Sequence, residues 1–190
     1  QTMETMHAEL ADKRQGVARH LRLCAGTAAI NQFLPALLAD YARLQPQIRV
    51  ELDEQVSESV VRALREGRAD VGVFVAGPST QGLQVAPFRQ DELVLVMPRG
   101  HPLSTERHAI DFSACLGEDW ISLTSGAAML QTQQQAALAS QRPLRLRMQV
   151  RSFDAVCHLV AAGLGVALLP KGALKHYGKS LPLRSRPLTD

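Results

Sequence analysis

Hydrophobic residues in this chain recur in short blocks that switch between the helical period and continuous apolar runs. The clearest example is a helical spacing of apolar residues over 152–162, where Ser152 or Asp154 can cap the first turn. Gly163 can end this helix. The unbroken apolar run 166–169 is typical of a strand covered on both faces of a parallel sheet. The segment therefore predicts a helix, whose start can hold an anion or carboxylate, followed by a buried strand.

The rest of the chain shows the same alternation. Strands are predicted at residues 21–25, 48–52, 70–75, 93–97, 120–123 and 144–150, with a further extended segment at 181–188. Helices are predicted at residues 30–41, between Ser57 and Gly67, at 129–139 and at 171–177. Pro35 either occupies the first turn of the first of these helices or kinks it there. Strands separated by helices in this way favour parallel sheets with right-handed crossovers.

The order of elements repeats, although the sequence itself does not. Residues 21–75 follow the order βαβαβ, and a second series of strands and helices begins after Pro98. The two halves therefore join near residues 88–98. The strand at 93–97 is the expected connector because it lies between the breaks at Pro87 and Pro98.

Composition limits the classes of function. A length of 190 residues suits one large domain or two small ones, and 46% hydrophobic and 21% charged residues are ordinary for a soluble α/β protein. The net charge is only +3, aromatic residues make up 4%, and no stripe of Lys and Arg is present. A nucleic-acid groove within these residues is therefore not expected. Neither a signal peptide nor an apolar run of membrane-spanning length is visible, so secretion and membrane insertion are not expected.

Motifs for catalysis or metal binding do not appear. Cys24, Cys115 and Cys157 lie far apart, with no CxxC or Cys/His cluster, so we expect no disulfide framework, no metal and no cofactor. Reduced thiols in a cytoplasmic protein are the simplest interpretation, and redox sensing by Cys115 and Cys157 is the alternative. There is no GxSxG, HExxH or glycine-rich phosphate loop, and the six histidines are scattered. We therefore predict no catalytic residue and no enzyme.

Small polar residues stand at four of the predicted strand exits. They are Gly26 and Thr27 after the first strand, Ser57 after the second, Thr124, Ser125 and Gly126 after the strand at 120–123, and Ser152 and Phe153 before the helix at 154–162. Ligands of open α/β sheets collect at the carboxyl ends of strands, beside helix starts. A cleft between the halves would thus place all four around a small molecule with an anionic or hydrogen-bonding group. Singly, each Ser or Thr can be only a cap, each glycine only a turn residue, and Phe153 either a core residue or a cleft wall.

Four blocks in series resemble a known family. They read LRLCAGTAAINQFLPALLADYARLQPQIRVEL, RALREGRADVGV, DELVLVMPRGHPLS and LVAAGLGVALLP. Their order and spacing over residues 19–188 are similar to the regulatory (effector-binding) domain of LysR-type transcriptional regulators. The resemblance implies an α/β fold, a two-lobed sandwich like the type-2 periplasmic binding proteins. Each lobe would be a mixed, mostly parallel sheet flanked by helices.

The resemblance also implies a domain organisation and partners. Residues 1–18 would be the end of a linker helix, 19–90 regulatory subdomain I and 91–190 regulatory subdomain II, with a return to subdomain I beyond residue 190. The function implied is the sensing of a small-molecule inducer between the lobes of a bacterial, cytoplasmic regulator. That regulator would form a homodimer or homotetramer, would not contact membranes and would bind promoter DNA through an N-terminal helix-turn-helix absent from this chain. A periplasmic solute-binding receptor of the same fold is the alternative.

The family's effector contacts would fall on Gly26, Thr27, Ala28, Ser57, Thr124, Ser125, Gly126 and Phe153. Ala28 stands where Ser or Thr is frequent in the family, and Val75 stands where some members carry an arginine that pairs with the inducer. An arginine there would clamp a carboxylate through two parallel hydrogen bonds. Either another arginine supplies this clamp, or the effector is less anionic than the family's aromatic acids. An organic acid is one candidate class of effector.

Overall fold

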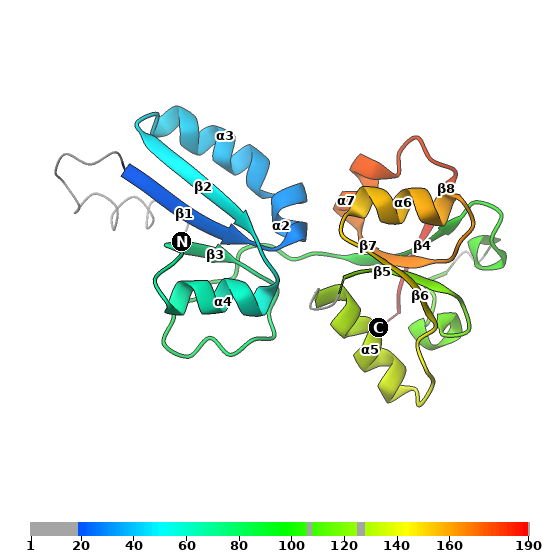
Figure 1. The fold of residues 1–190 in the computed structure, drawn as a ribbon. Helices are drawn as coiled ribbons and strands as arrows, with labels where there is room; N and C mark the ends of the chain where they lie inside the picture. The colour runs from blue at the N-terminus through cyan, green and yellow to red at the C-terminus, as the bar shows by residue number, and fades with distance from the viewer. Residues whose placement is uncertain (1–18, 106–107, 125–127, 190) are drawn as a thin grey trace.

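The computed structural model describes residues 19–105, 108–124 and 128–189, which form two α/β bodies side by side (Figure 1). The elements of the first body lie within residues 19–73 and those of the second within 93–189. Residues 74–92 join them and form neither helix nor strand. The predicted linker-helix tail, residues 1–18, lies outside the described residues.

The first body is a three-stranded parallel sheet with helices on both faces (Figure 1). Its strands, in sheet order, are β2 (Ile48–Glu54), β1 (Arg19–Ala25) and β3 (Val71–Val73), and its helices are α2 (Thr27–Gln32), α3 (Leu34–Leu44) and α4 (Ser57–Arg65). Successive side chains of β1 point to opposite faces. Leu23 and Ala25 pack in one core cluster with Leu34 of α3, whereas Cys24 packs in another with Val60 of α4.

Three details of the first body differ from the predicted pattern. The helix predicted at 30–41 is broken at Phe33 into α2 and α3, and Pro35 takes the first turn of α3, where its missing N–H costs nothing. Leu52, an apolar residue at the end of the strand predicted at 48–52, is 41% exposed. The third strand ends at Val73, because β1 ends at Ala25 and offers no further partner, and Val75 beyond it is 50% exposed.

The second body contains a mixed sheet. Its strands are β4 (Leu93–Pro98), β5 (Trp120–Leu123), β6 (Leu146–Val150), β7 (Ala167–Pro170) and β8 (Leu183–Pro187). Its helices are α5 (Ala128–Ala139), α6 (Phe153–Ala161), α7 (Lys171–Tyr177), η1 (Pro102–Thr105) and η2 (Phe112–Cys115). Strand β4 pairs antiparallel with both β7 and β8, while β5 and β6 are parallel. A parallel bridge between Trp120 and Val166 joins β5 to β7.

Two predictions about the second body need correction. Strand β4 does not connect the halves but lies between β7 and β8, and residues 94–97 are buried there. The apolar run 166–169 was predicted to lie in a parallel sheet, and Val166 does bridge in parallel to Trp120 of β5, but the ladder between β7 and β4 is antiparallel. The run is apolar because core clusters cover both of its faces, with Leu169 in one cluster and Leu168 in the other. The apolar composition of this strand therefore indicates burial on both faces and does not indicate strand direction.

The connection from α6 to β7 forms as the sequence predicts. Ser152 is the cap of α6, its Oγ accepting a hydrogen bond from Ala155 N at 3.2 Å, while Asp154 lies in the first turn. Gly163 has a left-handed φ of 79°, which permits the end of the helix. Gly165 then passes so close to the start of β5 that a Cβ atom there would lie 2.3 Å from Asp119 O. This contact fixes β7 beside β5.

The three cysteines are all buried, with Cys24 2% exposed and both Cys115 and Cys157 fully covered. Burial, with a smaller contribution from the Asp154 carboxylate, raises the pKa of Cys157 to about 11, and burial also raises the pKa of Cys24. Only the thiolate reacts readily. We therefore expect no reaction with Ellman's reagent at pH 8 in the native protein and three equivalents after unfolding. Rapid reaction of a native thiol would favour the redox-sensing alternative.

Candidate functional site

The exits of the first body's three strands meet at one edge of the sheet, because the strands are parallel. Gly26 N donates a hydrogen bond to Val73 O at 2.9 Å, and Gln55 N donates to Ala25 O at 3.0 Å. These bonds hold Gly26 beside the end of β3 and Gln55 beside the end of β1. The predicted residues Gly26, Thr27 and Ser57 therefore share this edge.

Ser57 does not cap α4, which was the alternative role that the sequence left open for it. The cap position is occupied by Val56, which offers no side-chain oxygen, and Ser57 is the first helical residue. Its Oγ accepts a hydrogen bond from Val75 N at 3.2 Å and so ties the start of α4 to the exit of β3. A hydroxyl has one donor and two acceptor sites, and this bond leaves the donor unused. Ser57 can therefore still donate to a ligand.

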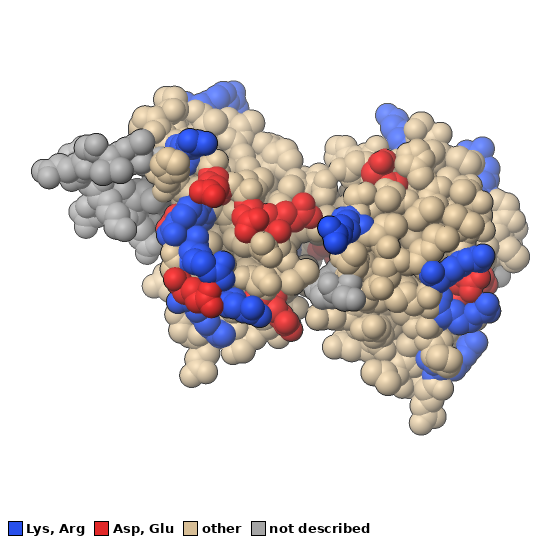
Figure 2. Space-filling model, viewed as in Figure 1, with Lys and Arg blue, Asp and Glu red and all other residues tan. Residues whose placement is uncertain are grey.

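Thr27 is the first residue of α2, and its hydroxyl is already committed. Its Oγ1 donates to Glu54 Oε1 at 2.5 Å, which ties α2 to the end of β2. The hydroxyl oxygen can then only accept a further hydrogen bond. Glu54 was not predicted as part of the site, and it is exposed. Figure 2 shows acidic side chains of the first body reaching the gap between the bodies, with a basic side chain of the second body across from them.

Two predicted residues of the second body are described, Thr124 after β5 and Phe153 after β6. Thr124 N donates to Val150 O at 2.9 Å, which joins the two strand exits. Phe153, the first residue of α6, is only 1% exposed and belongs to the main core cluster. Of its two predicted roles, the structure therefore supports a core residue, and only its backbone remains a candidate for ligand contact. Ser125 and Gly126 lie outside the described residues.

Helix α2 brings the two sets of exits together. Ala28, half-buried, packs against the second body's core cluster, which contains Leu123 and Phe153. Further along the same helix, Asn31 accepts a hydrogen bond from Tyr177 of α7 at 2.7 Å. The exit of β1, with Thr27 and Ala28, thus lies against the second body.

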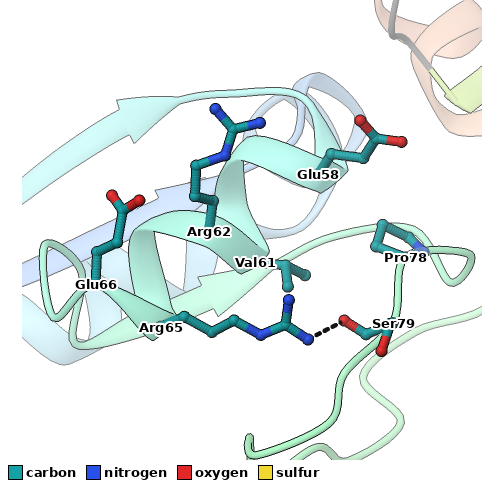
Figure 3. Close-up of a pocket in the computed structure, with 7 residues that line it drawn as sticks. All are labelled: Glu58, Val61, Arg62, Arg65, Glu66, Pro78 and Ser79. Atoms are coloured by element: carbon teal, nitrogen blue, oxygen red, sulfur yellow. Dashed lines mark hydrogen bonds between the residues drawn. The ribbon is translucent and has the colours of Figure 1, made fainter.

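Two surface hollows lie elsewhere and contain none of the predicted residues. One, of about 400 Å³, lies between the outer side of α4 and the following loop, where Arg65 donates to the backbone oxygen of Ser79 at 2.8 Å (Figure 3). The other, of about 360 Å³, lies beside α5 and is lined by Leu138 and Leu144. Because none of the predicted site residues lines either hollow, neither is taken as the candidate site.

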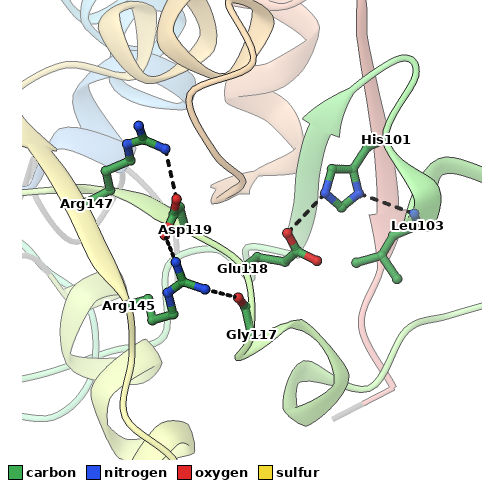
Figure 4. Close-up of polar contacts among 7 residues, drawn as sticks. All are labelled: His101, Leu103, Gly117, Glu118, Asp119, Arg145 and Arg147. Carbon is green, nitrogen blue, oxygen red and sulfur yellow. Dashed lines mark hydrogen bonds and ion pairs between the residues drawn. The ribbon is translucent and has the colours of Figure 1, made fainter.

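Charged contacts of the second body secure loops at the far end of β5. Asp119 accepts from Arg145 at 2.9 Å and from Arg147 at 2.8 Å (Figure 4). His101 Nε2 lies 3.2 Å from Glu118 Oε2, and its Nδ1 accepts from Leu103 N at 3.2 Å. Glu118 and Asp119 directly precede β5, whereas Thr124 follows it, so these contacts stand apart from the candidate site.

The described residues also bear on the other classes of site. Within that part of the chain no group of three or more His, Cys, Asp or Glu side chains is placed to hold a metal ion. None of the helices that the structure describes is long and apolar enough to cross a membrane.

Comparison with known proteins identifies the family. The model of the LysR substrate binding domain matches residues 14–190. The HTH-type transcriptional regulator CysL of Bacillus subtilis is 24% identical over 172 residues, covering 90% of this chain and 57% of that protein. The chain spans about half the length of the curated relatives it matches.

Solved structures agree with this match. The CcmR regulatory domain of Synechocystis PCC6803 in complex with 2-PG superposes with a TM-score of 0.78 at 25% identity, covering 90% of this chain and 81% of that one. The effector binding domain of QuiR in complex with shikimate gives 0.76 at 16% identity, with coverages of 92% and 82%, and shows the fold alone. The two-body α/β architecture is thus that of LysR effector-binding domains, and this chain belongs to the LysR substrate-binding domain family.

Proposed function

We propose that this chain is the effector-binding domain of a LysR-type transcription regulator and that a small molecule binds between its two bodies. One observation carries the proposal: α2 begins at the edge where β1, β2 and β3 end, and its Ala28 packs against the second body. A molecule held at Thr27 and Ser57 therefore also lies beside the exits of β5 and β6. The proposed site comprises Gly26, Thr27, Ala28, Ser57, Thr124, Ser125, Gly126 and the backbone of Phe153.

The two bodies then correspond to subdomain I, residues 19–90, and subdomain II, residues 91–190. The effector would favour one angle between them and so change how paired regulators hold promoter DNA. The DNA-binding part belongs to this proposal by analogy with HTH-type transcriptional regulators such as CysL. The homodimer or homotetramer and the cytoplasmic location belong to it through the family resemblance. The relatives support a regulator over the periplasmic receptor of the same fold. They give no reason to assign a catalytic residue.

The class of effector follows from the polar groups at the site. Val75, at the exit of β3, offers no guanidinium, and Glu54 places a carboxylate beside Thr27. Backbone amides at the starts of α4 and α6 remain as donors. We therefore propose a small organic molecule with hydroxyl or carbonyl groups and little net negative charge. An acid such as the shikimate bound by QuiR fits less well unless an arginine of the second body pairs with it.

A thermal-shift screen of this chain against organic acids, amino acids and neutral polar metabolites tests the proposal. A compound at a hundred times its dissociation constant adds about 2.7 kcal/mol to the free energy of unfolding. For a protein of this size that raises Tm by about 5 to 10 °C. No shift with any compound, together with no promoter binding by the full-length regulator, would reject the proposal.

Removing the site hydroxyls is expected to weaken binding of a compound found in this way. Thr27→Val and Ser57→Ala each delete one ligand hydrogen bond, which corresponds to an increase in Kd of about tenfold. Isothermal titration calorimetry measures the change. Ser79→Ala is the matched control, because this exposed hydroxyl lies on the same body but in the outer loop beside α4. Equal affinity of all three variants would show that the site lies elsewhere.

A further inference from the structure

A chain of hydrogen bonds crosses from the second body to the first residue of α2. Tyr177 OH donates to Asn31 Oδ1 at 2.7 Å, and Asn31 Nδ2 donates to Thr27 O at 2.8 Å. Both bonds are partly buried. The amide of Asn31 thus uses its acceptor toward α7 and its donor toward Thr27. The opposite orientation would place its oxygen against the oxygen of Thr27, so the two bonds fix one orientation together.

A second contact holds the same two helices together. Gln32 Nε2 donates to Asp91 Oδ2 at 2.9 Å, at the end of the segment that joins the bodies. The Gln32 side chain also lies directly on Gly172 of α7, where a Cβ atom would come within 2.0 Å of Gln32 Oε1. A side chain at position 172 would have to push this flexible amide aside. The contact between α2 and α7, which we term the α2–α7 seam, is therefore close and specific.

The start of α7 is anchored to the joining segment as well. Lys171 N donates to Glu92 O at 2.8 Å, and Lys171 Nζ pairs with Glu92 Oε2 at 2.8 Å. Gln32 and Lys171 thus contact neighbouring residues, Asp91 and Glu92, from the two sides of the seam. Any rotation of one body against the other must act on this group of contacts.

We propose that Asn31 and Tyr177 are positioning residues that couple Thr27 at the strand exits to the arrangement of the two bodies across the α2–α7 seam. Thr27 is held at two points, by Asn31 through its backbone oxygen and by Glu54 through its hydroxyl. A displacement of Thr27 moves its backbone oxygen, to which Asn31 donates. The Asn31 amide then moves with it and displaces its other partner, Tyr177. The regulatory meaning of this coupling rests on the proposed function, because Thr27 contacts an effector only if the strand exits are the site.

Tyr177→Phe tests the coupling, since it deletes only the hydroxyl at the far end of the chain of bonds. In ¹⁵N-resolved NMR spectra of the unliganded protein, we expect the amide signals of Thr27, Ala28 and Asn31 to shift or broaden. We also expect a broader distance distribution between spin labels on α3 and α5, at the exposed positions Ala39 and Gln135, measured by electron–electron double resonance. Lys175→Met is the matched control on the same helix, because Lys175 is exposed and makes no hydrogen bond or ion pair with α2 among the described residues.

Asn31→Asp provides the second variant, because it keeps the acceptor for Tyr177 and loses the donor to Thr27. Asn31→Asp should move the Thr27 and Ala28 signals while the α2–α7 seam persists. If Tyr177→Phe does not fold, Asn31→Asp alone tests the coupling. Unchanged Thr27 and Ala28 signals in both variants, with an unchanged distance distribution, would overturn the coupling. These measurements need no effector. A negative result in these measurements would reject the coupling without bearing on the proposed function. An effector screen that finds no binder would bear on the proposed function without rejecting the coupling.

Discussion

Replacing Gly165 by alanine is expected to lower the free energy of unfolding of the second body by about 3 kcal/mol. The added Cβ would lie 2.3 Å from Asp119 O and 3.0 Å from Asp119 C. These are backbone atoms, which cannot rotate away as the end of a side chain can. Moving them breaks the hydrogen bond from Val166 N to Asp119 O at 2.8 Å and strains the next one, from Ile121 N to Val166 O at 2.9 Å. The variant therefore separates β5 from β7 at the point where the sheet is joined.

Urea unfolding followed by circular dichroism and by the fluorescence of Trp120 measures the loss, because this buried residue begins β5. Gly100→Ala is the control, since a Cβ at Gly100 meets no atom within 4 Å. We expect the control to stay within about 0.5 kcal/mol of the parent protein. A Gly165→Ala protein as stable as the control would mean that the two strands can separate without cost.

The elements that sequence patterns predicted best are those whose local signals agree. The strand at 120–123 and the helix at 171–177 have the predicted bounds, and the helix of the 152–162 segment begins at its Ser152 cap and ends before Gly163. In each of these elements, residues that locally favour the start or the end of a helix or strand flank the apolar pattern. Local chemistry was sufficient there because no distant contact opposed it.

The errors have a common physical origin in contacts between distant segments. An apolar run reports burial on both faces, so it could not show that β4 lies antiparallel to β7. The position of Ser57 before a helix suggested a cap, but the oxygen is turned instead toward Val75, which the register of the sheet brings beside it. The break at Phe33 places Pro35 in the first turn of α3, where its missing N–H is not needed. From the sequence, Pro35 could equally have been in the first turn or at a kink within one longer helix.

The candidate site divides in the same way. Gly26, Thr27 and Ser57 could be predicted because small polar residues after strands are a local signal. Glu54 and Tyr177 could not, since one reaches Thr27 through the register between β1 and β2, and the other reaches Asn31 from 146 residues away. Their residue types are common at exposed or half-buried positions and carry no signature of their own. Only the fold brings them to α2.

Phe153→Ala is expected to cost about 3 to 5 kcal/mol of stability, because it empties a ring-sized volume in the main core of the second body. The side chain is 1% exposed and packs in the cluster that contains Val94, Leu123 and Leu169. Phe88→Ala is the matched control, since Phe88 is 38% exposed and its ring packs perpendicular to that of Phe33 at a centroid distance of 6.2 Å. Thermal and urea unfolding should separate the two variants clearly.

A second substitution at the same position separates packing from ligand contact. Phe153→Leu retains most of the apolar volume and should cost less than about 1.5 kcal/mol if the core repacks around it. Since the ring faces the core, the leucine variant should keep the full thermal shift with any compound that stabilises the parent chain. Loss of that shift in a stable Phe153→Leu protein would show that the ring itself touches the effector. The cleft-wall role of Phe153, the alternative left open by the sequence, would then be correct.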